Sequence, residues 1–128
     1  MARACQGPGK ILLCVDDSQG ILEYERSLFE RSGYIVVTAA SALEGLRLAT
    51  MSSFDAVLLD YHMPGMDGHQ LASEIRRMRP ETPVVMFCGE EVPEETRKLV
   101  DAVVPKDEAT RELLPTVTRI CNRFAQHS

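Results

Sequence analysis

The chain has 128 residues, of which 45% are hydrophobic and 26% are charged, enough for one globular domain that buries its own core. Its formal net charge is −5 and only 5% of its residues are aromatic, which argues against direct nucleic-acid binding because that normally needs a basic patch. Neither a secretory signal pattern nor an apolar stretch of membrane-spanning length is present, so we expect a cytoplasmic protein without membrane contact.

Short apolar runs alternate with amphipathic segments along the chain. Five runs rich in aliphatic residues are too short for helices and predict buried strands. They cover residues 11–15, 34–38, 56–59, 83–87 and 102–104. Cys14 and Cys88 fall at the ends of two of these runs, and we expect both to be buried thiols.

Helical spacing of apolar residues fills the intervals between these runs. The predicted helices cover residues 18–31, 41–52 and 70–79, with at most about two turns inside 92–100. Ser18 and Ser41 are the expected N-caps. Pro115 is tolerable only in the first turn of a helix, so we expect the last helix to start near Leu113.

Five alternations of strand and helix predict a parallel sheet covered on both faces. With right-handed crossovers, the natural architecture is a flavodoxin-like doubly wound α/β sheet with strand order 2-1-3-4-5. It would carry five helices, the fourth reduced. We expect this domain to occupy residues 10–126, after a disordered tail at residues 1–9.

Acidic residues stand where two of the predicted strands end. Asp16 and Asp17 follow the first strand and Asp60 follows the third. These strands are neighbours in the predicted order, so the carboxylates should converge, and Mg²⁺ would relieve their mutual repulsion. Lys106, after the fifth strand, could reach the same pocket as a positive charge for phosphate. Such a set suits phosphoryl transfer, although Asp16 and Asp17 taken alone could simply be acids at a helix N-terminus.

The chain resembles the receiver domains of two-component response regulators. The resemblance extends from Lys10 to Phe124 and is carried by Lys106 and by two motifs. They read Ile-Leu-Leu-Cys-Val-Asp-Asp at residues 11–17 and Asp-Tyr-His-Met-Pro-Gly-Met-Asp-Gly at residues 60–68.

The resemblance implies a role for each residue of the acidic pocket. Asp60 would accept the phosphoryl group, and Lys106 would pair with the phosphorylated side chain. Mg²⁺ would be bound by Asp17 with the help of Asp16, by Asp60, and by the main-chain carbonyl of His62. Receivers phosphorylate and dephosphorylate themselves but are not usually classed as enzymes.

Three residues depart from the family pattern. Cys88 occupies the position where receivers usually have Ser or Thr, and a thiol is a much weaker hydrogen-bond donor than a hydroxyl. Val103 occupies the position of the switch aromatic, and Asp107 replaces the proline that usually follows the lysine. We therefore expect phosphorylation at Asp60 with an altered readout.

Three functions remain open at this point. In the leading one, a histidine kinase or histidine phosphotransfer protein donates the phosphoryl group, and the phosphorylated surface binds a downstream protein of unknown identity. Homodimerisation is possible. A pseudo-receiver that binds partners without phosphorylation is the first alternative. A Mg²⁺-dependent phosphohydrolase is the second, but a chain of 128 residues has no insertion to form a substrate cap.

Overall fold

Five parallel strands form the central sheet of the structure, a computed structural model that describes residues 9–125. Their order is β2-β1-β3-β4-β5, which confirms the predicted topology. The strands are β1 (Ile11–Val15), β2 (Ile35–Ala39), β3 (Ala56–Asp60), β4 (Val84–Cys88) and β5 (Ala102–Pro105). Apart from Gly9, the predicted disordered tail lies outside the described residues.

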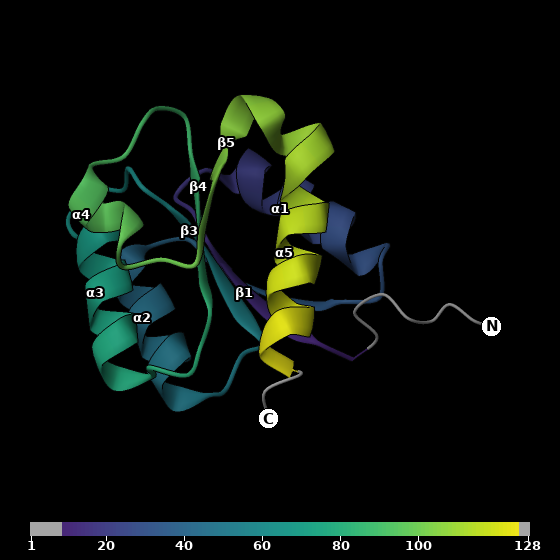
Figure 1. The fold of residues 1–128 in the computed structure, drawn as a ribbon, viewed down its shortest axis with the longest axis horizontal. Coiled ribbons are helices and arrows are strands. Elements are labelled where there is room, and N and C mark those ends of the chain that lie inside the picture. The colour runs from purple at the N-terminus through teal and green to yellow at the C-terminus, as the bar shows by residue number, and fades with distance from the viewer. Residues whose placement is uncertain (1–8, 126–128) are drawn as a thin grey trace.

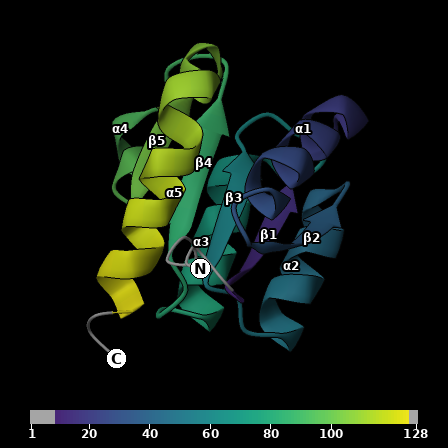
Figure 2. The ribbon, with the colours of Figure 1, turned by 90° about the vertical axis from the view of Figure 1, so that its right-hand side faces the viewer.

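Helices cover both faces of the sheet (Figures 1 and 2). One face carries α1 (Gln19–Glu30) and α5 (Ala109–Ala125), and the other carries α2 (Ala42–Met51) and α3 (Gly68–Met78). The single-turn α4 (Glu94–Arg97) lies beside α3, where the buried Thr96 hydroxyl hydrogen-bonds to His69 Nδ1 at 2.8 Å. Within residues 9–125, no helix combines the length and apolar character needed to cross a membrane.

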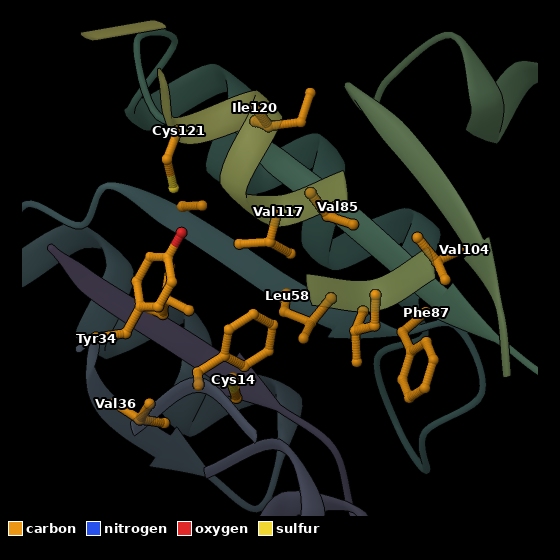
Figure 3. Packing of buried hydrophobic residues seen from close by; sticks show 14 of the residues in the cluster. Cys14, Tyr34, Val36, Leu58, Val85, Phe87, Val104, Val117, Ile120 and Cys121 are labelled. Carbon is orange, nitrogen blue, oxygen red and sulfur yellow. The ribbon is translucent and has the colours of Figure 1, made fainter. Parts of the chain in front are cut away.

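Alternate residues of the central strands supply two apolar layers, one on each face of the sheet. On the face of α1 and α5, Cys14, Leu58 and Phe87 pack in one buried cluster (Figure 3). On the opposite face, Leu13 and Met86 pack in a second one. Burial of both faces explains why β1, β3 and β4 read as continuous apolar runs. The Cys14 and Cys88 thiols are free and buried, as predicted.

The last helix differs from the prediction at its start. It begins at Ala109, after a 3-10 turn at Lys106–Glu108, so Pro115 lies inside it. The proline has no N–H to donate to the carbonyl of Arg111. Both residues are exposed, so water can supply the missing partner, and the helix continues. The expected start near Leu113 was therefore wrong.

Two other helices differ at their ends. α4 is a single turn, shorter than the two turns that the sequence allowed. α3 begins at Gly68, two residues before the predicted start, because Asp67 forms a reciprocal capping box with Gln70. Asp67 Oδ1 accepts from Gln70 N at 2.9 Å, and Gln70 Oε1 accepts from Asp67 N at 3.0 Å. These bonds satisfy two backbone donors near the start of the helix.

Candidate functional site

The carboxyl ends of β1 and β3 bring three acids together. Asp16 and Asp17 follow β1 directly, and Asp60 is the last residue of β3. One carboxylate oxygen from each of the three lies within 4.8 Å of the others. Asp16 and Asp60 are buried, whereas Asp17 is exposed. The structure thus confirms that these acids converge at one end of the sheet.

The turn between β1 and α1 fixes the orientation of Asp16. The backbone N–H of Ser18 donates to Asp16 Oδ1 at 2.9 Å, and Ser18 caps α1 by accepting from Ile21 N at 3.3 Å. Asp16 Oδ2 is buried and has no hydrogen-bond partner in the structure. Burial raises the pKa of Asp16, and the neighbouring charge of Asp60 adds to that increase.

Lys106 supplies a positive charge to the acidic pocket, as predicted. Its Nζ lies 3.0 Å from Asp60 Oδ1 and 3.6 Å from Asp16 Oδ2, and its side chain is 28% exposed. The ammonium also lies over the Phe87 ring, 5.6 Å from the centroid. Although burial lowers the pKa of Lys106, the hydrogen bond to Asp60 and the charge of Asp16 outweigh it, and the pKa is raised overall.

The donor set of this pocket fits a hard divalent cation. One ammonium faces three carboxylates, so negative charge remains uncompensated, and a buried carboxylate oxygen without a hydrogen bond, such as Asp16 Oδ2, is costly. Mg²⁺ is bound in proteins by one or two carboxylates together with water and phosphate oxygens. Asp16, Asp17 and Asp60 therefore fit this ion, and coordination by the His62 carbonyl remains a prediction.

Gly68 allows the start of α3 to approach the end of β3. A Cβ atom at this position would lie 2.7 Å from the Asp60 carbonyl oxygen and 2.7 Å from Tyr61 Cα. The Gly68 N–H donates to the Tyr61 carbonyl at 2.7 Å. Only glycine fits such a close approach without displacing the backbone that carries Asp60. Gly68 was predicted only as a turn residue, and the structure adds this packing role.

Cys88 ends β4 next to the acidic pocket, opposite Pro105 of β5. It is 2% exposed, and burial raises the pKa of its thiol. Gly89 follows, and a Cβ added there would meet no atom within 4 Å. Val103 is half-buried in β5, opposite Met86. The Ser or Thr position and the aromatic position of the family therefore hold a buried thiol and an aliphatic side chain.

The His62 side chain pairs with another residue, whereas the metal ligand expected from His62 is its main-chain carbonyl. Its Nε2 is paired with the carboxylate of Glu90, and both side chains are more than half exposed. This pair joins the loop after β3 to the loop after β4. Nothing in the spacing of the two residues along the chain indicates this pair, so it could not be predicted.

Glu25 is a buried acid that was not among the predicted site residues. It is 2% exposed, and its Oε1 has no hydrogen-bond partner. Burial, followed by the charge of Asp16, raises the pKa of Glu25 to about 8. Its spacing from Leu22 and Phe29, three residues after one and four before the other, places it on the apolar stripe of α1. Its place on this stripe is the sequence feature by which Glu25 could have been noticed.

Comparisons with known proteins agree with this geometry. The family model of the response regulator receiver domain matches residues 12–117. The transcriptional regulatory protein GlrR of Escherichia coli is 43% identical over 78 residues, an alignment that covers 61% of this chain and 18% of GlrR. The chain therefore matches only a minor part of that relative.

Solved structures extend the similarity to almost the whole fold. A CheY-like response regulator receiver domain protein from Methanospirillum hungatei is 28% identical with a TM-score of 0.87, covering 94% of this chain and 99% of that one. TrrA from Thermotoga maritima, crystallised in complex with Mg²⁺-BeF, is 27% identical with a TM-score of 0.83, covering 87% of this chain and 98% of that one. This chain belongs to the family of response regulator receiver domains.

Proposed function

We propose that Asp60 accepts a phosphoryl group in a Mg²⁺-dependent reaction, and that a histidine kinase or histidine phosphotransfer protein donates it. One observation carries the proposal: three carboxylates converge within 4.8 Å, and the Lys106 ammonium lies 3.0 Å from the acceptor. These groups would serve as a nucleophile, a set of metal ligands and a counter-charge within one pocket.

Each residue has a defined task in this reaction. A carboxylate oxygen of Asp60 attacks phosphorus, the bond to the donor's imidazole nitrogen breaks, and the electron pair of that bond stays on nitrogen. Asp16, Asp17 and Asp60 would hold Mg²⁺, with the His62 carbonyl as the expected further ligand, and the ion would neutralise charge on the phosphoryl oxygens. Lys106 donates a hydrogen bond to Asp60 Oδ1 in this structure, and after the transfer it would donate to a phosphoryl oxygen instead.

The readout of phosphorylation would differ from that of receivers in which a Ser or Thr hydroxyl is coupled to the switch aromatic. Cys88 is a weak hydrogen-bond donor and Val103 has no ring to swing. The segment after β4 is instead tied to α3 by Arg76, whose guanidinium donates to the Leu99 carbonyl at 2.9 Å and to Asp101 Oδ2 at 2.9 Å. Structures with and without beryllium fluoride would contradict this reading if Cys88 and Val103 rearranged as their counterparts do.

The phosphorylated surface would bind a downstream protein, and the domain would work in the cytoplasm without direct contact with DNA. Homodimerisation stays a prediction. Labelling should stop at one phosphoryl group per chain, because the reaction is self-modification and not turnover of a substrate.

Intact-mass spectrometry after incubation with Mg²⁺ and acetyl phosphate tests the proposal. We expect one added phosphoryl group on the native chain, none on Asp60→Asn, and none when EDTA removes the metal. Asp55→Asn is a matched control at the other end of β3. Asp55 is exposed and accepts a hydrogen bond from Ile11 N at 2.8 Å, which asparagine can also accept. Equal labelling of Asp60→Asn and native protein would contradict the proposal.

A pseudo-receiver is the second candidate, and the thiol at Cys88 favours it. Such a module would keep the acidic pocket but would not be phosphorylated. It predicts no labelling by acetyl phosphate and no beryllium fluoride binding, even with saturating Mg²⁺. Labelling of Asp60 would exclude it.

A further inference from the structure

Glu25 is a buried titratable group that phosphoryl transfer does not use. It lies on the inner side of α1, with its Oε1 without a hydrogen-bond partner, and the Cys14 thiol of β1 is its neighbour. A carboxylate buried without sufficient partners is costly, so the neutral, protonated form is favoured. Glu25 therefore holds a proton inside the domain at neutral pH.

The Glu25 carboxyl lies close to the acidic pocket, as the strand register of its neighbour Cys14 indicates. Cys14 lies opposite Leu58 in the β1–β3 pair, and both belong to the buried cluster on the face of α1 and α5 (Figure 3). Asp16 and Asp60 are each two residues further along the same strands, so they project from the same face about 7 Å beyond. The Glu25 carboxyl, at Cys14, is thus about one side-chain layer below the metal-binding acids.

The groups that face Glu25 are few and come from identifiable elements. Asp16 follows β1, Lys106 follows β5 and Asp60 ends β3. The charge of Asp16 has the largest effect on the Glu25 pKa and raises it, that of Lys106 is next and lowers it, and that of Asp60 is the smallest and raises it. Cys14 is the fourth group, and its thiol pKa is raised well above the ordinary value by burial and then by Glu25. From α5, the buried cluster on this face contains Leu113, Val117 and Ile120, which are apolar, and the thiol of Cys121.

We propose that Glu25 is a proton-binding site coupled to the metal site: binding of a divalent cation at the acidic pocket promotes release of the Glu25 proton, and the proton weakens binding of the cation. This coupling rests on the proposed Mg²⁺ site. The two effects are reciprocal by thermodynamic linkage. Charges about 7 Å apart at a partly buried site interact strongly enough to change such an equilibrium about tenfold.

Calorimetric titration with Mg²⁺ at about pH 7 and about pH 9 measures the coupling. In the native protein the dissociation constant for Mg²⁺ should fall about fivefold from the lower to the higher pH. The full coupling is about tenfold, and most of it appears over this interval because Glu25 loses its proton around a pKa of about 8. Glu25→Gln should lose this difference. Glu23→Gln removes an exposed acid from the same helix and should behave like the native protein.

Carbon-detected NMR of the Glu25 side-chain carboxyl gives a second readout that needs no variant. In metal-free protein its titration midpoint should lie near pH 8, and Mg²⁺ should lower that midpoint by about one pH unit. Tight Mg²⁺ binding with equal pH dependence in the native protein and Glu25→Gln would refute the coupling alone. Absence of Mg²⁺ binding at both pH values would refute the metal site and the coupling with it.

Discussion

Replacing Glu25 with glutamine should change how the stability of the domain depends on pH. The folded protein holds the Glu25 proton up to about pH 8, because burial and then the charge of Asp16 raise its pKa, whereas the unfolded chain releases the proton near 4.5. Between these values the folded state binds one more proton than the unfolded state, so the free energy of unfolding falls as pH rises. Below about pH 4.5 both states are protonated, and above about pH 8 the loss is complete.

The size of this effect follows from the two pKa values. Their difference of about 3.5 corresponds to about 5 kcal/mol. The interval from about pH 5.5 to about pH 8.5 covers roughly 3 kcal/mol of it. This is a large part of the stability of an ordinary domain, which is roughly 5–15 kcal/mol.

Urea unfolding followed by circular dichroism at about pH 5.5, 7 and 8.5 measures the difference. Over that interval the native protein should lose about 3 kcal/mol more unfolding free energy than Glu25→Gln. Glu23→Gln should follow the native protein, since that side chain is exposed on the same helix. Parallel pH profiles of the native protein and Glu25→Gln would refute the reasoning, because they would show that Glu25 carries no raised pKa in the folded state.

Three further perturbations test the site. Lys106→Met should raise the affinity for Mg²⁺ several-fold in calorimetry, because it removes a cation 3.0 Å from Asp60 and 3.6 Å from Asp16; unchanged or weaker binding would count against it. Gly68→Ala should lower the unfolding free energy by about 1–3 kcal/mol through overpacking, whereas Gly89→Ala, with open space for a Cβ, should change it little. Mg²⁺ at about a hundred times its dissociation constant should stabilise the native protein by about 2.7 kcal/mol in urea unfolding, and Asp16→Asn should lose most of that gain.

The sequence was informative where a residue's role follows from its place on an element. Asp16 directly follows a buried strand and Asp60 ends another, so the topology alone brings their carboxylates together. Lys106 directly follows the fifth strand, so the same rule places it at this end of the sheet. Strand order could be predicted because right-handed crossovers leave few arrangements of five alternating units. The reduced fourth helix could also be predicted, since residues 92–100 leave room for at most about two turns.

Features that depend on tertiary contacts were not predictable. Pro115 would normally stop a helix, but its exposed position lets α5 run through it. The short α4 depends on partners from α3, such as the bond between His69 and Thr96, which no local pattern encodes. Glu25 differs, because its place on an apolar stripe is visible in the sequence, whereas its degree of burial and its proximity to Asp16 are not.

Chemical location of the phosphoryl group tests the central claim, that Asp60 is the acceptor, most directly. Borohydride reduces an aspartyl phosphate to homoserine, and trypsin should release residues 48–76 as one peptide, because arginines precede and end it. After labelling with acetyl phosphate and Mg²⁺, fragmentation of this peptide should show homoserine at position 60, with Asp55 and Asp67 unchanged. Homoserine at another aspartate, or an unmodified position 60 in labelled protein, would contradict the account.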